Sequence, residues 1–319
     1  MAKFIEGYCN QQMPPPYEFQ DVRIWDFPIL AQADAVAAIV SKFLPAKPIL
    51  ESTGASFQIL RGVGPFWNST MIYLMVLDYG AMSCVGTTDY LPQKELYFAI
   101  PLVRSKKGIP VDIVLFTPYI FVDNPWSMIC GNTVLGFPKQ LAWFLMSGDD
   151  RDPYPIQVTT SVFAKKGVCV QTWQSFVVIK DTGLLQAAEQ SCEKLWPFGD
   201  IGLLFGENGV LPLADETLEL FNQLVNAEAL SYDIVQLKQL RNAQKPAEAS
   251  YQALVTSTVH LQQYRFGSLL PSAAVSVPAY PSLAISQDLG IPENGTVLFP
   301  VWLRCSFEIS NSIEQPLQG

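Results

Sequence analysis

The sequence has little of the chemistry that most enzyme motifs need. Its 319 residues include a single histidine, His260, and six cysteines, of which the nearest two, Cys169 and Cys192, lie 23 positions apart. A CxxC pair is therefore absent, and zinc ligation of the usual kind is hard to assemble. The chain also lacks G-x-G-x-x-G, G-x-x-x-x-G-K-[ST] and G-x-S-x-G, so dinucleotide, P-loop and serine-hydrolase chemistry are without their motifs. We expect neither a cofactor nor a metal.

Charges and long apolar runs are also scarce. Charged residues make up 15% of the chain, the net charge is -9, and lysine and arginine form no stripe, which argues against nucleic acid as a partner. No stretch reaches the roughly 18 uncharged apolar residues of a membrane span. The opening MAKFIEGYCNQQ lacks the apolar centre of a signal peptide. We therefore expect a cytoplasmic protein with reduced thiols and no membrane partner.

Short apolar segments separated by turns make up most of the chain. Apolar residues account for 49%, and 24 prolines and 20 glycines are scattered without a repeat, which is typical of an ordered, β-rich protein. Strands are predicted at 21–31, 56–61, 70–79, 95–104, 111–122, 126–130, 155–165, 168–180, 232–242, 251–265 and 296–308, and helices at 33–43, 184–196 and 214–230. The simplest organisation is an extended arm over 1–20 and one mainly β (α+β) domain over 21–319.

One lysine interrupts the most apolar part of the chain. Lys139 lies in the middle of GNTVLGFPKQLAWFL (131–145), and a lysine is almost never fully buried unless something is gained. Because desolvation disfavours the ammonium form, a lysine in such surroundings loses its proton more easily. The neutral amine can attack a ketone and form a Schiff base, whose iminium draws electrons from the neighbouring carbon. The alternative is that the side chain extends from a strand edge into solvent.

Three segments resemble the acetoacetate decarboxylase family. DNPWSMICGNTVLGFPKQLAW (123–143) is similar to the family's nucleophile segment, in which Lys139 takes the place of the Schiff-base lysine. ELYFAIP (95–101) is similar to the segment that carries an active-site glutamate, which falls on Glu95. RIWDFPIL (23–30) resembles the opening strand and places the family's active-site arginine on Arg23. The resemblance implies a large antiparallel β-cone or barrel with peripheral helices, an active site in its apolar interior, and a homo-oligomer.

The chain departs from the family pattern at several positions. The family's second lysine, which helps the nucleophile to lose its proton, is replaced by Gln140. A second family glutamate falls within 71–79, where the aligned position is Leu74. The chain is longer than typical members, and the excess falls in an insertion at 207–230 and in the tail. These departures indicate a divergent branch that does not act on acetoacetate itself.

The resemblance gives three residues a direct part in the chemistry. Lys139 is expected to be the nucleophile, and Glu95 to carry protons or contact the substrate. Arg23 is expected to hold a carboxylate or carbonyl group, because a guanidinium suits two-pronged recognition. Two other interpretations stay open. In the first, Glu95 is an exposed carboxylate at a strand end. In the second, Arg23 forms an ordinary surface ion pair with Asp21 or Asp26.

Three further residues are expected to line the substrate pocket. Phe137 helps to desolvate the lysine, and the hydroxyl of Tyr97 faces the pocket. Gln140 donates a hydrogen bond to a substrate oxygen where the family's ammonium binds a carboxylate. The alternatives are that Gln140 points away from the pocket and that Tyr97 is an ordinary core aromatic residue.

These observations leave three hypotheses for function. The first is a Schiff-base-forming lyase that uses Lys139 on a small-molecule carbonyl compound such as a β-keto acid, by decarboxylation or by aldol, retro-aldol and dehydration steps. The second is a non-catalytic binding protein that holds a hydrophobic ligand in the apolar cone. The missing second lysine and glutamate favour that alternative. The third is an isomerase or cyclase that uses the same lysine.

Overall fold

The computed structural model describes residues 12–62, 68–84, 90–147, 149, 152–163, 171–182, 231–298, 300–310 and 312–317, with the backbone alone at 264–269. The strands are β1 Tyr17–Gln32, β2 Ala55–Ile59, β3 Ser69–Cys84, β4 Leu91–Lys106, β5 Ile109–Val122, β6 Lys139–Leu145, β7 Ile156–Phe163, β8 Gln171–Asp181, β9 Ser231–Arg241, β10 Ala249–Leu269, β11 Ala273–Ser276, β12 Asn294–Val297, β13 Val301–Ile309 and β14 Ile313–Pro316. The helices are α1 Ala33–Phe43, α2 Ala46–Thr53, α3 Pro125–Cys130, the π-helix η2 Gly131–Leu135, and α6 Ile285–Leu289.

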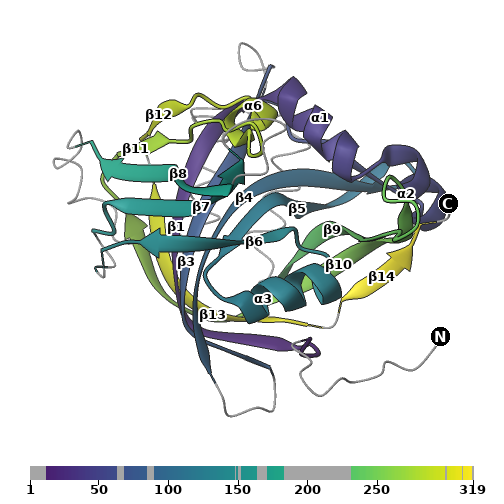
Figure 1. Cartoon of the computed structure of the whole chain (residues 1–319), viewed down its shortest axis with the longest axis horizontal. Helices are drawn as coiled ribbons and strands as arrows, with labels where there is room; N and C mark the ends of the chain where they lie inside the picture. The colour runs from purple at the N-terminus through teal and green to yellow at the C-terminus, as the bar shows by residue number, and fades with distance from the viewer. Residues whose placement is uncertain are drawn as a thin grey trace.

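Seven long strands close into a ring. Each of β4, β5, β9, β10, β13, β1 and β3 pairs with the next, and β3 pairs with β4 to complete the circle. The pairings are antiparallel except for β5 with β9. Closure leaves these strands without open edges, which is how a β-barrel protects its backbone hydrogen bonds. Figure 1 shows the ring strands curving around a common interior.

Alternation along the strands gives the ring two apolar faces. On β1, Ile24 belongs to an inner core inside the ring, whereas its neighbours Trp25 and Phe27 belong to an outer core. On β4, Tyr97 faces the inner core and Leu96 the outer one. Successive side chains of a strand point to opposite faces of a sheet, so this pattern follows from the backbone. The ring is therefore buried on both sides.

The outer core is covered by helices and by a branch of the sheet. The branch leaves the ring at β5, which pairs in parallel with β6, and continues through β7, β8, β11 and β12. Helices α1 and α6 contact each other over the same core and lie close together in Figure 1. Helix α3 lies apart from them, next to β6. This branch point brings the Lys139 segment against the mouth of the ring.

The predicted fold class is confirmed: the protein is mainly β, with a ring of strands and few helices. Helix 33–43 was predicted with the bounds that α1 has, and the strand predicted at 21–31 begins earlier, at Tyr17, within the predicted arm. The ring is largely antiparallel, as expected, and β5 is the strand that departs from this pattern, because it pairs in parallel with both β6 and β9. The predicted helices 184–196 and 214–230 and the insertion 207–230 lie outside the described residues.

Within the described part of the chain, no helix has both the length and the apolar character needed to cross a bilayer.

Candidate active site

The segment before Lys139 is a short helix, and the strand predicted at 126–130 was wrong. The side chain of Asn124 accepts hydrogen bonds from the backbone N–H groups of Trp126 and Ser127, and Pro125 is the first residue of α3. Asparagine at the N-cap followed by proline is a strong helix start, because it satisfies donors that have no partner within the helix. The apolar letters WSMIC indicated a strand, but the capping pair before them decides the structure.

The chain then turns back on itself to begin β6. The π-helix η2 ends at Gly136, whose φ of +74° is a conformation that glycine adopts without strain. Asn132 fixes the residue that follows the turn: its side-chain Oδ1 accepts from the backbone N–H of Lys139 at 2.8 Å, and its Nδ2 donates to the carbonyl of Lys139 at 3.0 Å. One amide side chain thus holds both backbone groups of the lysine in place.

The Lys139 side chain runs over the end of α3 to reach a carboxylate. Its Nζ lies 2.7 Å from Oε2 of Glu95, and it donates a second hydrogen bond to Oγ of Ser127 at 2.9 Å. The two charged side chains are only 10% and 9% exposed. The same Nζ lies 5.8 Å from the centre of the Phe137 ring, within the range of a cation–π contact. Lys139 is therefore paired inside the protein and does not extend into solvent.

Glu95 is held by two other side chains of the inner core. Tyr79 donates its hydroxyl to Oε1 at 3.1 Å, and Gln93 donates its Nε2 to Oε2 at 3.0 Å. Burial, followed by the nearby Glu95 and Tyr97, raises the pKa of Tyr79 well above its usual value, so the phenol stays protonated and remains a donor. A carboxylate that accepts from an ammonium, a phenol and an amide is positioned to exchange a proton with the lysine beside it.

Solved structures match this chain, although no family model and no curated protein does. The acetoacetate decarboxylase of Legionella pneumophila subsp. pneumophila str. Philadelphia 1 matches with a TM-score of 0.58 at 12% identity, over 99% of this chain and 93% of that one. The enduracididine biosynthesis enzyme MppR matches at 0.54 and 12%, over 98% and 92%. An acetoacetate decarboxylase-like enzyme from Sphingomonas wittichii RW1 matches at 0.51 and 11%, over 99% of each chain.

The chain has the acetoacetate decarboxylase fold. At 11–13% identity the likeness concerns architecture, and it confirms the fold that the resemblance of segments 95–101 and 123–143 predicted.

Of the six predicted site residues, this fold brings four to the same interior. Lys139 contacts both Glu95 and Phe137, as described above. Tyr97 is buried on the same face of β4 as Glu95, and burial, followed by Tyr232 and Glu95, raises its pKa well above the usual value. Tyr97 therefore adds a protonated hydroxyl deeper in the ring.

The structure does not bring Arg23 and Gln140 to the lysine. Arg23 lies two residues before Trp25 on β1 and therefore faces the outer side of the sheet, as Trp25 does. Its guanidinium contacts the Trp25 indole and lies 2.7 Å from Oδ2 of Asp78. Its place in the structure is thus an ion pair, with Asp78 as partner. Gln140 is exposed and lies on the face of β6 opposite to Lys139, as expected for the next residue of a strand. Neither side chain is oriented to contact a substrate at Lys139.

The position expected for a second glutamate is also displaced from the site. Leu74 is fully buried in the outer core, and its neighbours Tyr73 and Met75 face the inner core instead. A one-residue shift in a strand moves a side chain to the other face of the sheet. An alignment error of one residue therefore decides whether a position in this strand is assigned to the inner site or to the outer core.

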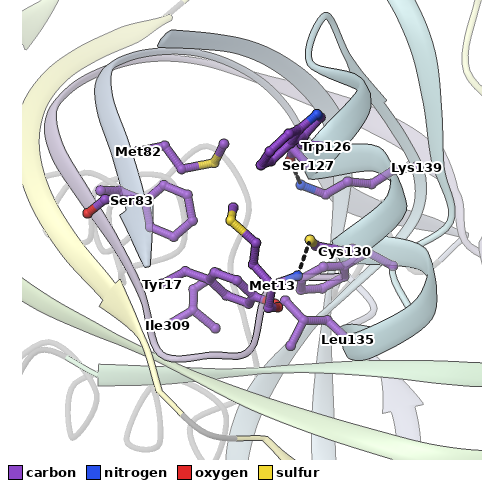
Figure 2. A pocket seen from close by; sticks show the side chains of 13 residues that line it. Met13, Tyr17, Met82, Ser83, Trp126, Ser127, Cys130, Leu135, Lys139 and Ile309 are labelled. Atoms are coloured by element: carbon purple, nitrogen blue, oxygen red, sulfur yellow. Dashed lines mark hydrogen bonds between the residues drawn. The ribbon is translucent and has the colours of Figure 1, made fainter. Parts of the chain in front are cut away.

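A pocket opens beside Lys139 at the end of the ring. Its volume, counted as the space open to the centre of a water molecule, is about 40 Å³, enough for a few waters. Figure 2 shows Met13 projecting into the middle of it, with Lys139 and Ser127 on one side and Met82 on the other. The backbone N–H of Met13 donates to Sγ of Cys130, and the backbone carbonyl of Met13 accepts from the hydroxyl of Tyr17. The lining is Met13, Tyr17, Phe19, Met82, Ser83, Trp126, Ser127, Cys130, Gly131, Leu135, Phe137, Lys139 and Ile309.

Several residues around the lysine were missed by sequence reasoning. Gln93 shares the inner face of β4 with Glu95, and the two-residue spacing could have indicated it. Tyr79 could not be found, because its position opposite Gln93 depends on the register between β3 and β4. Ser127 and Asn132 needed α3 to be recognised as a helix, and the Asn-Pro pair before it was the available signal.

Proposed function

We propose that the protein is a lyase that forms a Schiff base between Lys139 and a small carbonyl compound, with Glu95 as the partner that moves protons. The observation that carries this proposal is the 2.7 Å contact between the lysine Nζ and the Glu95 carboxylate inside the ring. A lysine placed in an apolar interior next to a base is the arrangement that iminium catalysis requires. The relatives in fold support the same class, since they include a decarboxylase and MppR, which was solved in complex with pyruvate.

The first steps use only groups that contact each other. Glu95 takes a proton from the ammonium, and the neutral amine of Lys139 bonds to the carbonyl carbon while the carbonyl oxygen takes up the proton. Loss of that oxygen as water gives the iminium. Ser127, which accepts a hydrogen bond from the same Nζ, keeps the amine oriented during this exchange. Because the side chains of Lys139 and Glu95 are only 10% and 9% exposed, nearby polar groups interact more strongly with the charge of the iminium than they would in water.

Cleavage follows from the electron demand of the iminium. A bond between the carbon next to the former carbonyl and a carboxylate breaks, its electrons form an enamine, and carbon dioxide leaves. With a β-hydroxy carbonyl compound, Glu95 takes the proton of the hydroxyl group, the bond between the two carbons breaks with its electrons forming the enamine, and an aldehyde leaves. Protonation of the enamine carbon and hydrolysis of the new iminium return the amine. We favour a β-keto acid or related compound. The departure at Gln140 no longer bears on the choice of substrate, because that side chain points away from the lysine.

Borohydride trapping tests the proposal. The protein is incubated with a panel of β-keto acids and ketones, reduced, and searched for an adduct by peptide mass spectrometry. We expect an adduct on Lys139 that disappears in Lys139→Met. Lys238→Met is the matched control, because Lys238 is another lysine paired with a carboxylate, at 2.9 Å from Glu314. The absence of any adduct up to pH ~9 would instead support a binding protein whose apolar pocket holds a hydrophobic ligand.

Product analysis separates the lyase from an isomerase or cyclase that uses the same iminium. A lyase releases carbon dioxide or an aldehyde in proportion to the substrate consumed. An isomerase or cyclase yields a product of the same mass as the substrate, and that result would replace the lyase assignment.

A further inference from the structure

A second carboxyl group lies inside the ring and has no part in the Lys139–Glu95 pair. Asp26 on β1 alternates with the outer-facing Trp25 and Phe27, so its side chain faces the inner core. Its Oδ1 is buried and has no hydrogen-bond partner among the described residues. Leaving a buried acceptor without a partner costs stability. A group that is retained at such a cost inside a candidate active site points to a function.

The strand register places Asp26 in the same cross-sheet row as Lys139. Asp26 pairs with Met75, Met75 with Tyr97, Tyr97 with Ile120, and Ile120 with Lys139. Residues that lie directly opposite one another on paired strands point to the same face of the sheet, so all five side chains face the interior of the ring.

Four steps around a ring of this size lead to the opposite wall. At the level of Lys139, β5 pairs with β6 at the mouth of the seven-stranded ring, and further along it pairs with β9. With strands ~4.8 Å apart and tilted by ~40°, such a ring is about 14 Å across. Asp26 and Lys139 therefore extend into the interior from different walls of the ring.

The wall around Asp26 consists of proton donors. Burial raises the pKa of Asp26 to about 8, and the backbone N–H of Phe27 offsets this only in part, so the carboxyl is neutral at pH 7. Burial and the nearby Asp26 also raise the pKa of Tyr73. Asp26, like Glu95, is among the neighbours that raise the pKa of Tyr97, so this phenol lies near both carboxyls. One acid and two phenols thus offer O–H groups, and such a wall suits an oxygen acceptor.

We propose that Asp26, together with Tyr97, contacts the substrate directly by donating a hydrogen bond to an oxygen at the far end of the molecule whose carbonyl carbon bonds to Lys139. The inference rests on the proposed function and narrows it. The substrate is a carbonyl compound with a second oxygen group, such as a carboxylate or a further carbonyl, several bonds from the reacting carbon. A simple ketone lacks this contact, and a compound that ends in a cation does not need a donor.

Two ligands of the same length test the contact. 4-Oxopentanoate carries a carboxylate where pentan-2-one carries a methyl group, and both are trapped with borohydride at pH 7. We expect trapping of 4-oxopentanoate to be at least tenfold more efficient in the wild-type protein, because a site built for a hydrogen bond rejects the analogue that lacks it. In Asp26→Leu this ratio should fall to near one, and Asp26→Asn, which still donates, should lie between.

The control is Asp78→Asn, which removes a carboxylate from the outer face of the neighbouring strand and should leave the ratio unchanged. An unchanged ratio in Asp26→Leu overturns the inference. So does faster trapping of (4-oxopentyl)trimethylammonium than of 4-oxopentanoate in the wild-type protein, since Asp26 would then act as an anion.

A non-covalent measurement separates this inference from the Schiff base. 4-Hydroxypentanoate and pentan-2-ol cannot form an iminium, and their binding to the unmodified protein is measured by calorimetry. A tenfold or greater preference for 4-hydroxypentanoate that is lost in Asp26→Leu supports the contact even if Lys139 traps nothing, in which case only the proposed function fails. Equal binding of the two alcohols, or a preference that survives Asp26→Leu, overturns the contact.

Discussion

A Cβ atom added to Gly131 would lie 2.6 Å from Cδ and 2.8 Å from Cε of Lys139. No side chain larger than hydrogen fits at this position while the lysine keeps its course. The backbone of Gly131 is helical, with φ -57° and ψ -49°, a conformation that every residue adopts. The glycine is therefore required by the path of the lysine side chain and not by the turn of the chain.

Gly131→Ala should displace the amine and reduce the stability of the fold by up to about 3 kcal/mol. The added methyl group forces the Lys139 side chain aside, and a displacement of about 1 Å at a reacting group can cost about 100-fold in rate. The overpacking costs about 1–3 kcal/mol of unfolding free energy, and the better helix propensity of alanine offsets up to about 1 kcal/mol of it. Borohydride trapping rate and urea unfolding measure the two effects. Gly295→Ala on β12 is the control, and equal trapping by the two variants would contradict this account.

Glu95→Gln should remove the proton acceptor and keep the shape of the site. The amide still accepts one hydrogen bond from Lys139, but it cannot take the proton that the amine must lose. We expect the trapping rate to fall by about 10²–10⁴-fold, the range typical of a lost general base. Glu314→Gln, which removes the acidic partner of Lys238, should leave trapping intact. A Glu95→Gln protein that traps ketones at the wild-type rate would exclude Glu95 from this step.

The architecture could be predicted because alternation and turns are local signals. The apolar segments of β1, β3, β4 and β5 were located from their composition, and α1 from its helical spacing and the acid in its first turn. Local sequence patterns do not predict which strands pair with one another around the ring. The parallel contact that joins Ile120 to Lys139 connects segments separated by α3 and η2, and it decides which side chains meet at the site.

The candidate site could be predicted where it depends on one motif and not where it depends on register. Lys139 and Glu95 lie in the two segments with specific resemblance, and the structure places them in contact. Arg23 was assigned from the resemblance of segment 23–30 and Leu74 from its aligned position within 71–79, and both face the outer side of the ring. Asp26 lies three residues after Arg23 on the same strand. Because side chains alternate between the two faces, an odd number of residues separates Arg23, which faces outward, from Asp26, which faces the interior.

Met13→Ala should widen the pocket in front of the lysine. Met13 projects into the middle of the pocket beside Lys139, where the open volume is about 40 Å³. Truncating this flexible side chain removes three heavy atoms, and we expect bulky ketones to be trapped several-fold faster relative to acetone. Acetone serves as the internal control, because any general loss of reactivity affects both ligands alike. An unchanged ratio would mean that substrates reach Lys139 by a path that avoids Met13.

Asp26 should make the protein less stable as the pH rises through the neutral range. The unfolded chain releases the aspartate proton above pH ~4, whereas the folded protein keeps it up to the raised pKa of about 8. Between these values the unfolded state binds fewer protons than the folded state, so the free energy of unfolding falls with increasing pH. The groups that face Asp26 from neighbouring strands, Tyr73 and Tyr97, stay protonated throughout this range and do not change the sign.

Asp26→Asn removes this dependence, because an amide does not titrate. The variant should equal the wild-type protein at pH 4 and exceed it by roughly 2–4 kcal/mol at pH 7, with no further gain above pH ~8. Urea unfolding of both proteins at each pH measures the difference, in which the titration of all other groups cancels. Asp78→Asn should instead be less stable than wild type at pH 7, since it breaks the ion pair with Arg23. A gain in stability from Asp26→Asn that does not change between pH 4 and 8 would mean that the Asp26 carboxyl is not held protonated inside the ring.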